Sequence, residues 1–367
     1  MNPSIFNLKN LLTKSIYGLS DKKSIPISEY ILFTSLSIMR GRNKNPIIHT
    51  AGSISTKYFQ EKFKISRSLC CDILDFCFDR IDEYRTGACK PSIPKGWLKE
   101  LTLKYISEID LDNNKILSTD NFEQLPENED FIISFKLPIE NIKNAILHAK
   151  LMYNEDEYHT FGPNNGEIKN NKDEYKMAQI YLEAALLRDG VFYEKYDYKT
   201  CGRLYQTRYG FQNMKKCVRN IAFKGFYNID INSSFFRMAY DLYASEWDEE
   251  LKNVISGLLE DKNLFYNNYV NPKELKINLL AILLGCNDQL IINYSELTYK
   301  INNLLNKWMS PVKRRKIIAN PLFHKEQEYI RNIINEINEL PCVLIHDGFI
   351  VNNNYKLDEK IWSIKKL

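Results

Sequence analysis

Two segments of the sequence carry carboxylates in positions suited to metal chemistry. The segment FYNIDINSSFFRMAYDLY predicts a strand over 226–231 that carries Asp230 and is followed by a helix. The segment PCVLIHDGFIV predicts a β-hairpin with Asp347 and Gly348 in its turn. A rigid strand end or turn that presents a carboxylate can hold a divalent cation, because carboxylate oxygens are ligands that such cations prefer.

Each segment also has an ordinary structural explanation. Asp230 alone could cap the helix that follows it, and Asp-Gly pairs commonly just turn the chain. A third segment, LKINLLAILLGC, predicts a nearly all-apolar helix that begins at Lys276 and ends at Gly285. A lysine there can reach a triphosphate, or it can simply extend to water.

In this order the three segments resemble motifs A, B and C of family A DNA polymerases and of the related phage-type single-subunit RNA polymerases. Asp230 and Arg237 keep the separation found in the family's D-Y-S-Q-I-E-L-R, and Lys276 and Gly285 keep that of the second motif. The third segment reads H-D-G where the family has H-D-E or H-D-S. The resemblance covers about residues 225–352, under half of the chain.

The resemblance implies a polymerase palm in which Asp230 and Asp347 hold two divalent ions, Mg²⁺ or Mn²⁺. Lys276 would contact the incoming triphosphate, His346 would support the primer end, and Arg237 would be a structural residue of the palm near the bound nucleotide. Phosphoryl transfer with two metal ions needs carboxylates that come together from separate strands, which agrees with this arrangement. The implied partners are a DNA primer-template and nucleoside triphosphates.

The sequence also departs from the family pattern. Phe235 replaces the family's glutamate at the sugar-facing position and is similar to the sugar-discriminating tyrosine of family B polymerases, so it would favour deoxynucleotides. Leu284 and Pro272 replace a tyrosine and an arginine of the second motif. The third motif follows the second more closely than in full-sized enzymes, which implies reduced fingers or a reduced palm.

Basic residues are concentrated just before the first of these motifs. Residues 195–219 hold seven bases against Asp197 alone, with tyrosines interleaved, which suits a groove for a nucleic-acid strand. The alternative is a solvated face. The bases predicted to contact nucleic acid are Arg203, Arg208, Lys215, Lys216 and Arg219. A further basic run could grip template phosphates or form a solvated turn, and it contains Lys313, Arg314 and Arg315.

Composition changes divide the chain into three predicted segments. Residues 1–105 are helical and resemble a winged helix-turn-helix DNA-binding module, with a helix capped by Ser66, although a plain helical packing module fits too. In that module Lys57, Lys62, Lys64 and Arg67 would contact phosphates. Residues 106–174 are an acidic linker, over about 108–130, and a helical segment, and residues 175–367 are the palm and fingers. Helical spacing also appears over 139–153 and 175–188. The predicted fold class is α+β, with a helix-rich palm and a small antiparallel sheet.

The overall composition excludes several protein classes. The 367 residues carry 50 Lys and Arg against 46 Asp and Glu, a formal charge of +4, and 44% are hydrophobic, as in globular proteins. No apolar run approaches the length of a membrane span, and the N-terminus lacks a signal-peptide pattern. The eight cysteines form no C-x-x-C pair, so their spacing suits neither a zinc site nor a disulfide framework. Because no secretory signal is seen, a reducing, cytoplasmic compartment is expected.

These observations favour template-directed nucleotidyl transfer by a compact DNA polymerase of a phage, plasmid or other mobile element. A single-subunit RNA polymerase or a reverse transcriptase is an alternative within the same chemistry. A non-catalytic DNA-binding protein, acting in replication initiation or regulation, is an alternative from another class. A metal-dependent nuclease would normally need more than two carboxylates.

Overall fold

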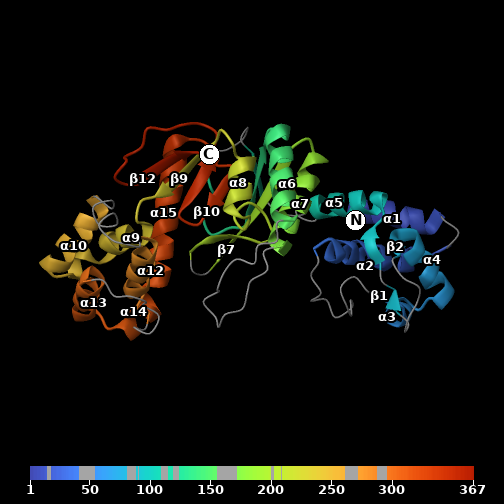
Figure 1. Ribbon diagram of the computed structural model, residues 1–367, viewed down its shortest axis with the longest axis horizontal. Coiled ribbons are helices and arrows are strands. Elements are labelled where there is room, and N and C mark those ends of the chain that lie inside the picture. Colours follow the sequence, from blue (N-terminus) through green and yellow to red (C-terminus); the bar gives the residue numbers. More distant parts are fainter. Residues whose placement is uncertain are drawn as a thin grey trace. The chain divides into compact units, whose positions relative to one another are not determined.

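The computed structural model of the chain (Figure 1) describes residues 1–14, 18–40, 54–80, 88–89, 91–108, 115–118, 124–154, 172–199, 202–207, 209–260, 272–286 and 296–367. The fold is α+β, as the sequence predicts, because helices predominate and small sheets accompany them. The chain forms two compact units, called unit 1 (residues 1–116, 134–194 and 208–224) and unit 2 (residues 117–133, 195–207 and 225–367). Within the described residues, no helix is both long enough and apolar enough to cross a membrane.

In the described residues of its first stretch, unit 1 has five helices and four short strands. The helices are α1 (Pro3–Lys14), α2 (Asp21–Arg40), α3 (Thr56–Phe63), α4 (Arg67–Cys77) and α5 (Gly96–Glu108). The strands are β1 (Ile54–Ser55), β2 (Phe78–Arg80), β3 (Ala88–Cys89) and β4 (Pro91–Pro94). β1 pairs with β3 and β2 pairs with β4, both antiparallel. The predicted cap is confirmed, because the Ser66 hydroxyl accepts a hydrogen bond from the Leu69 amide at the start of α4.

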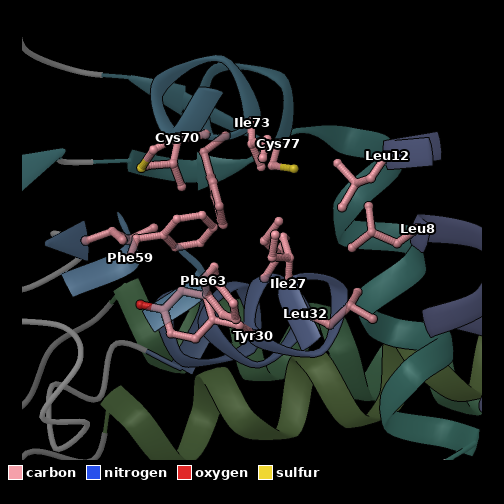
Figure 2. Packing of buried hydrophobic residues seen from close by; sticks show 14 of the residues in the cluster. Leu8, Leu12, Ile27, Tyr30, Leu32, Phe59, Phe63, Cys70, Ile73 and Cys77 are labelled. Carbon is pink, nitrogen blue, oxygen red and sulfur yellow. The ribbon is translucent and has the colours of Figure 1, made fainter. Parts of the chain in front are cut away.

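Side chains of α2, α3 and α4 pack into one hydrophobic cluster (Figure 2). Tyr30 packs edge-on against Phe59 and Phe63, with ring centroids 5.3 and 5.5 Å apart. Ile73 and Cys77 of α4 are fully buried in the same cluster. Burying one large aliphatic side chain contributes roughly 1.5–3 kcal/mol, so this cluster holds α3 and α4 against α2.

The rest of unit 1 contains the two helices predicted from apolar spacing. They are α6 (Ile139–Asn154) and α7 (Lys172–Leu186), and the short α8 (Lys216–Ala222) follows later in the chain. Gly190 follows α7 with a φ of 82°, in the left-handed region that glycine favours. Glu194 is fully buried and accepts hydrogen bonds from the Tyr181 hydroxyl and the Phe211 amide. The Glu194 carboxylate therefore has hydrogen-bond donors inside unit 1.

The acidic segment over 108–130 is not wholly a linker. Its described part includes β5 (Lys115–Ser118), and the buried β6 (Phe131–Lys136) follows directly. With β7 (Val191–Tyr198) and β8 (Leu204–Gln206), these strands form a sheet in the order β5-β6-β7-β8. A strand of four residues is stable only when another strand pairs with it, and that partner is not visible in the local sequence.

Unit 2 contains a sheet in the order β10-β11-β9-β12, with every neighbouring pair antiparallel. Its strands are β9 (Tyr227–Ile231), β10 (Val343–Ile345), β11 (Gly348–Val351) and β12 (Trp362–Lys366). Its helices are α9 (Ser234–Tyr243), the 3₁₀ helix η1 (Ala244–Glu246), α10 (Glu249–Glu260), α12 (Pro272–Leu283), α13 (Glu296–Trp308), α14 (Pro311–Ile317) and α15 (Ala319–Ile337). The predicted strand near residue 230, the helix after it and the β10-β11 hairpin are confirmed. α15 packs against α9 (Figure 1).

Candidate active site

The two predicted catalytic aspartates lie at the same end of the unit 2 sheet, Asp230 on β9 and Asp347 in the turn directly before the neighbouring β11. β9 and β11 are antiparallel, and their register places Asp230 directly opposite Gly348. One position further, the Ile231 amide donates a hydrogen bond of 2.8 Å to the carbonyl oxygen of Asp347. The backbones of both aspartates are therefore held by one ladder of hydrogen bonds, although they are far apart in the sequence.

The hairpin turn differs by one residue from the predicted Asp-Gly turn. Ile345 pairs with Gly348, so the two turn residues are His346 and Asp347. None of the residues 346–348 has a positive φ. The prediction is wrong because it assumed that glycine is present for its left-handed backbone, whereas Gly348 is the first residue of β11.

Gly348 lets the Asp230 carboxylate pack directly against the backbone of β11. A Cβ on Gly348 would lie well inside van der Waals contact with Oδ1 of Asp230 and with the carbonyl oxygen of Ile229. The other carboxylate oxygen, Oδ2, accepts a hydrogen bond from the side-chain amide of Asn228. Asn228 stands two residues earlier on the same face of β9, so it orients the Asp230 carboxylate without neutralising its charge.

A third carboxylate, which the sequence analysis does not single out, is buried close to these strands. Glu326 of α15 is 1% exposed. Its Oε1 lies 2.8 Å from Nε and 2.6 Å from Nη2 of Arg203, and its Oε2 accepts a hydrogen bond of 2.6 Å from the Ser234 hydroxyl. Ser234 begins α9 and Arg203 directly precedes β8, so one carboxylate connects three elements of unit 2.

The position of Glu326 on its helix is the sequence signal that could have found it. Leu322, Ile330 and Ile334 are buried on one stripe of α15 at intervals of four and eight residues. Glu326 falls on the same stripe, between Leu322 and Ile330. A glutamate within an apolar stripe requires a buried partner, because an unpaired buried charge is costly.

The electrostatics connect Glu326 with the candidate catalytic turn. Burial raises the pKa of Glu326, while the Arg203 guanidinium and the Ser234 hydroxyl oppose this rise. The negative charge of Asp347 adds to the rise. The charges of Asp347 and Glu326 therefore act on one another.

Phe235, the predicted sugar-discriminating residue, packs against this network. Its ring is edge-on to Phe323 of α15, with centroids 5.8 Å apart. The Arg203 guanidinium lies 4.1 Å from the centroid of Phe323 and 5.5 Å from that of Phe235. The prediction that Arg203 presents its charge to a nucleic-acid strand does not fit, because the side chain is 11% exposed and its guanidinium is paired with Glu326.

His346 lies between β8 and α15. Its ring is 5.6 Å from the ring of Tyr205 on β8, and its carbonyl oxygen accepts a hydrogen bond of 3.5 Å from the side-chain amide of Gln327. Tyr205 and Gln327 are both partly or largely buried, so they fix the turn from two sides. The residue predicted to support a primer end is thus held in a defined position.

Lys276 lies on the exposed side of α12. The helix begins at Pro272, one turn earlier than predicted, and ends at Leu283. Leu275 and Leu279 are buried, whereas Lys276 is exposed. Its ammonium group is therefore accessible to an anionic ligand.

The second basic run is only partly available for phosphates. Arg314 is 1% exposed, and Nη2 donates hydrogen bonds to the Ile282 carbonyl at 3.2 Å and to Asn306 Oδ1 at 3.0 Å. The prediction that Arg314 grips template phosphates is wrong, because its guanidinium is used within unit 2. Arg315 is exposed but donates two hydrogen bonds to the Gly285 carbonyl, and Lys313 is exposed.

The other predicted nucleic-acid ligands belong to unit 1, except that Arg208 lies outside the described residues. Lys215 pairs with Glu174 at 2.8 Å, and Arg219 donates a hydrogen bond of 3.1 Å to the Phe211 carbonyl. Lys216 is exposed. Two bases of this run, Lys215 and Arg219, therefore interact with other residues of unit 1.

Arg237, which the resemblance places near the nucleotide, connects α9 with the segment before β12. Its Nη2 donates a hydrogen bond of 2.5 Å to the Lys360 carbonyl, and its Nε donates one of 3.5 Å to the Asn232 carbonyl. Both hydrogen bonds go to backbone within unit 2, so the geometry is that of a structural brace.

The residues of the site fit divalent metal ions of the Mg²⁺ type. Carboxylate oxygens are hard ligands, and Mg²⁺ in nucleotide enzymes is commonly held by one or two carboxylates together with substrate phosphates and water. Asn228 orients the Asp230 carboxylate through one oxygen, and the other oxygen packs against Gly348. Within the described residues, no group of three or more His, Cys, Asp or Glu side chains is gathered as a complete metal-binding set.

Comparisons of this chain with protein-family models, with curated proteins and with solved structures return no match. The assignment below therefore rests on the residues and the geometry of the site.

Proposed function

We propose that this protein is a compact, metal-dependent, template-directed DNA polymerase of the kind that a phage, plasmid or other mobile element encodes. The observation that supports it most is the β9–β11 register, which joins Asp230 to the His346-Asp347 turn at one end of an antiparallel sheet. In this proposal the β10-β11-β9-β12 sheet with α9 and α15 is the palm. The order of the three motifs along the chain, which resembles that of family A polymerases, is a second support for the proposal.

The side chains around the sheet end would divide the work between holding and positioning. Asp230 and Asp347 would hold two divalent ions, which when bound activate the attacking 3′-oxygen and stabilise the leaving pyrophosphate. Asn228 would keep the Asp230 carboxylate in its orientation. Glu326 would fix the start of α9 through Ser234 and thus the exit of the chain from β9.

The nucleotide would be recognised by its sugar and its phosphates. Phe235 packs against both Phe323 and the Arg203 guanidinium, so its ring would be a fixed obstacle to a ribose 2′-hydroxyl. Lys276 would attract the triphosphate by charge from the exposed side of α12. A site with these features would prefer deoxynucleoside triphosphates.

The test is template-directed incorporation by the full-length protein. A primer is annealed to four templates that differ only in the first unpaired base, and each deoxynucleotide and ribonucleotide is offered singly with Mg²⁺ or Mn²⁺. We expect selective addition of the complementary deoxynucleotide. Addition that ignores the template base, or that prefers ribonucleotides, would contradict the proposal.

A further inference from the structure

Unit 1 carries an exposed basic surface that the proposed active site does not use. It is formed by four residues, called the basic turn below: Lys23 in the first turn of α2, Lys62 in the last turn of α3, Lys64 between α3 and α4, and Arg67 at the start of α4. All four side chains are exposed. Three helices therefore contribute positive charge to one place.

Specific interactions hold the basic turn together. The ammonium group of Lys23 donates a hydrogen bond of 2.9 Å to the carbonyl oxygen of Lys64, which joins α2 to the connection between α3 and α4. Lys62 lies over the Tyr30 ring at 5.1 Å from its centroid. The hydrophobic cluster beneath these residues (Figure 2) gives the surface a rigid support.

Two acidic side chains of α2 and α3 lie against lysines outside the basic turn, and Glu29 is a further exposed acid of α2. Asp21 pairs with Lys9 at 2.9 Å, and Glu61 lies 4.0 Å from Lys57. Both acids are thus matched by lysines outside the basic turn. The next acids, Asp72 and Asp75, stand one and two turns further along α4. The charge on α4 is therefore positive at its start and negative beyond it.

We infer that the basic turn docks the phosphate backbone of double-stranded DNA. Two helices joined by the three residues 64–66 and followed by the antiparallel β2–β4 pair have the element order of a winged helix-turn-helix. In such modules the N-terminus of the second helix approaches the major groove of the DNA. Here the second helix is α4, and its N-terminus carries the positive charge of Arg67. The inference does not depend on the proposed polymerase activity, because none of these residues belongs to that site.

The chemistry of the surface favours duplex DNA over other nucleic acids. Single strands are held by successive exposed rings on which bases stack. Of the three rings beside Lys62, Tyr30 and Phe63 are only 5% and 8% exposed, and Tyr58 is 37% exposed, so the surface offers one ring and not a row of them. A-form RNA duplexes have a major groove too narrow for a helix. A surface of charges around a helix start suits the backbone and the wide major groove of B-form DNA.

The experiment measures binding of the full-length protein to a DNA duplex closed by a hairpin loop at each end. Such a probe has no 3′ terminus, so it does not offer the proposed active site a primer end. The test variant is Lys23→Gln/Lys64→Asn/Arg67→Gln, in which asparagine suits the φ of 50° at position 64. The matched control is Lys115→Gln/Lys143→Gln/Lys224→Gln, which removes three exposed charges elsewhere in unit 1.

We expect the test variant to bind the closed duplex at least roughly tenfold more weakly than the wild type. The slope of log affinity against log salt concentration should become shallower by about 0.9 for each phosphate that the variant no longer neutralises. The control should bind as the wild type does, and Arg67→Lys should retain binding that Arg67→Gln weakens. Equal binding by the test and control variants would overturn the inference. So would tighter binding of single-stranded DNA or duplex RNA than of the closed duplex.

The same proteins separate this inference from the proposed function. Asp230→Asn should bind the closed duplex normally, and the test variant should extend a saturating primer-template at the wild-type rate. Loss of extension in Asp230→Asn alone leaves the docking inference intact. Thermal unfolding checks that each variant is folded. If the triple variant does not fold, the comparison of Arg67→Lys with Arg67→Gln decides whether the basic turn binds DNA.

Discussion

At the scale of single residues, the candidate site depends on the immediate surroundings of the Asp230 carboxylate. Asn228 donates a hydrogen bond to one carboxylate oxygen, and the absence of a side chain at Gly348 lets the other oxygen pack against the backbone there. Glu326 acts one layer further out, through Ser234 and Arg203. These residues can be changed without removing either aspartate.

Replacing Gly348 by alanine is expected to abolish primer extension and to lower stability. The new methyl group would overlap the Asp230 carboxylate and the Ile229 carbonyl, and overpacking of this kind costs about 1–3 kcal/mol. Urea denaturation and primer extension measure the two effects. Gly96→Ala is the control, because nothing lies within 4 Å of its added Cβ. Full activity and stability in Gly348→Ala would contradict the packing described for Asp230.

Replacing Glu326 by glutamine is expected to destabilise unit 2 strongly. The change leaves the Arg203 guanidinium largely buried without its counter-charge, which costs about 3–5 kcal/mol. On the same helix, Glu328 pairs with Lys325 at 2.7 Å but is 53% exposed. Glu328→Gln should therefore cost at most about 1 kcal/mol. Similar decreases in unfolding free energy for both variants in urea denaturation would argue against a structural role for the buried pair.

The residue pattern predicts the two aspartates but not what surrounds them. Asp230 and Asp347 could be found because the first lies in a local strand pattern and the second lies between two such patterns. Glu326 could not be assigned, because its partners Arg203 and Ser234 are 123 and 92 residues away in the chain. The reason for glycine at position 348 is equally remote, since it is the side chain of Asp230.

At the scale of elements, the end of α12 is fixed by residues of α14. Gly285 follows the helix with a φ of 72°, and a Cβ there would overlap the Pro311 carbonyl. Arg314 and Arg315 donate hydrogen bonds to the carbonyls of Ile282 and Gly285. Carbonyls at a helix C-terminus lack partners within the helix, so these arginines supply them.

Replacing Gly285 by alanine is expected to disturb the packing of α12 against α14. Backbone strain at a positive φ costs roughly 1 kcal/mol, and the overlap with Pro311 adds to it. Gly225→Ala is the matched control, because Gly225 has a φ of 95° but nothing within 4 Å of its Cβ position. The decrease in unfolding free energy should therefore be clearly larger for Gly285→Ala. Equal decreases would mean that the backbone angle alone accounts for the effect.

Elements with a strong local pattern could be predicted, and those that depend on a distant partner could not. α6, α7, β9 and the β10-β11 hairpin follow from apolar spacing. β5 and β6 surround an acidic stretch whose composition suggested a linker. Arg314 was assigned to phosphates from charge alone, because its sequence neighbourhood does not reveal the α12 carbonyls that it contacts.

At the scale of the whole molecule, the division of the chain differs in kind from what composition suggests. The predicted segments follow one another along the chain, whereas each compact unit takes three separate stretches of it. Composition marks changes along the chain but cannot show where the chain leaves a unit and returns. The net charge of +4 says similarly little about partners. Arginines such as Arg203 and Arg314 contribute to it, although their guanidinium groups are bound inside the fold.

The central claim is that Asp230 and Asp347 together support metal-dependent nucleotidyl transfer. Its most direct test is primer extension with Mg²⁺ or Mn²⁺ by the wild type, by Asp230→Asn and by Asp347→Asn. Asp248→Asn is the control, because Asp248 caps α10 through the Leu251 amide and asparagine can do the same. We expect the wild type and the control to extend the primer and both site variants to be slower by roughly a hundredfold or more. Extension at the wild-type rate by either site variant would contradict the account.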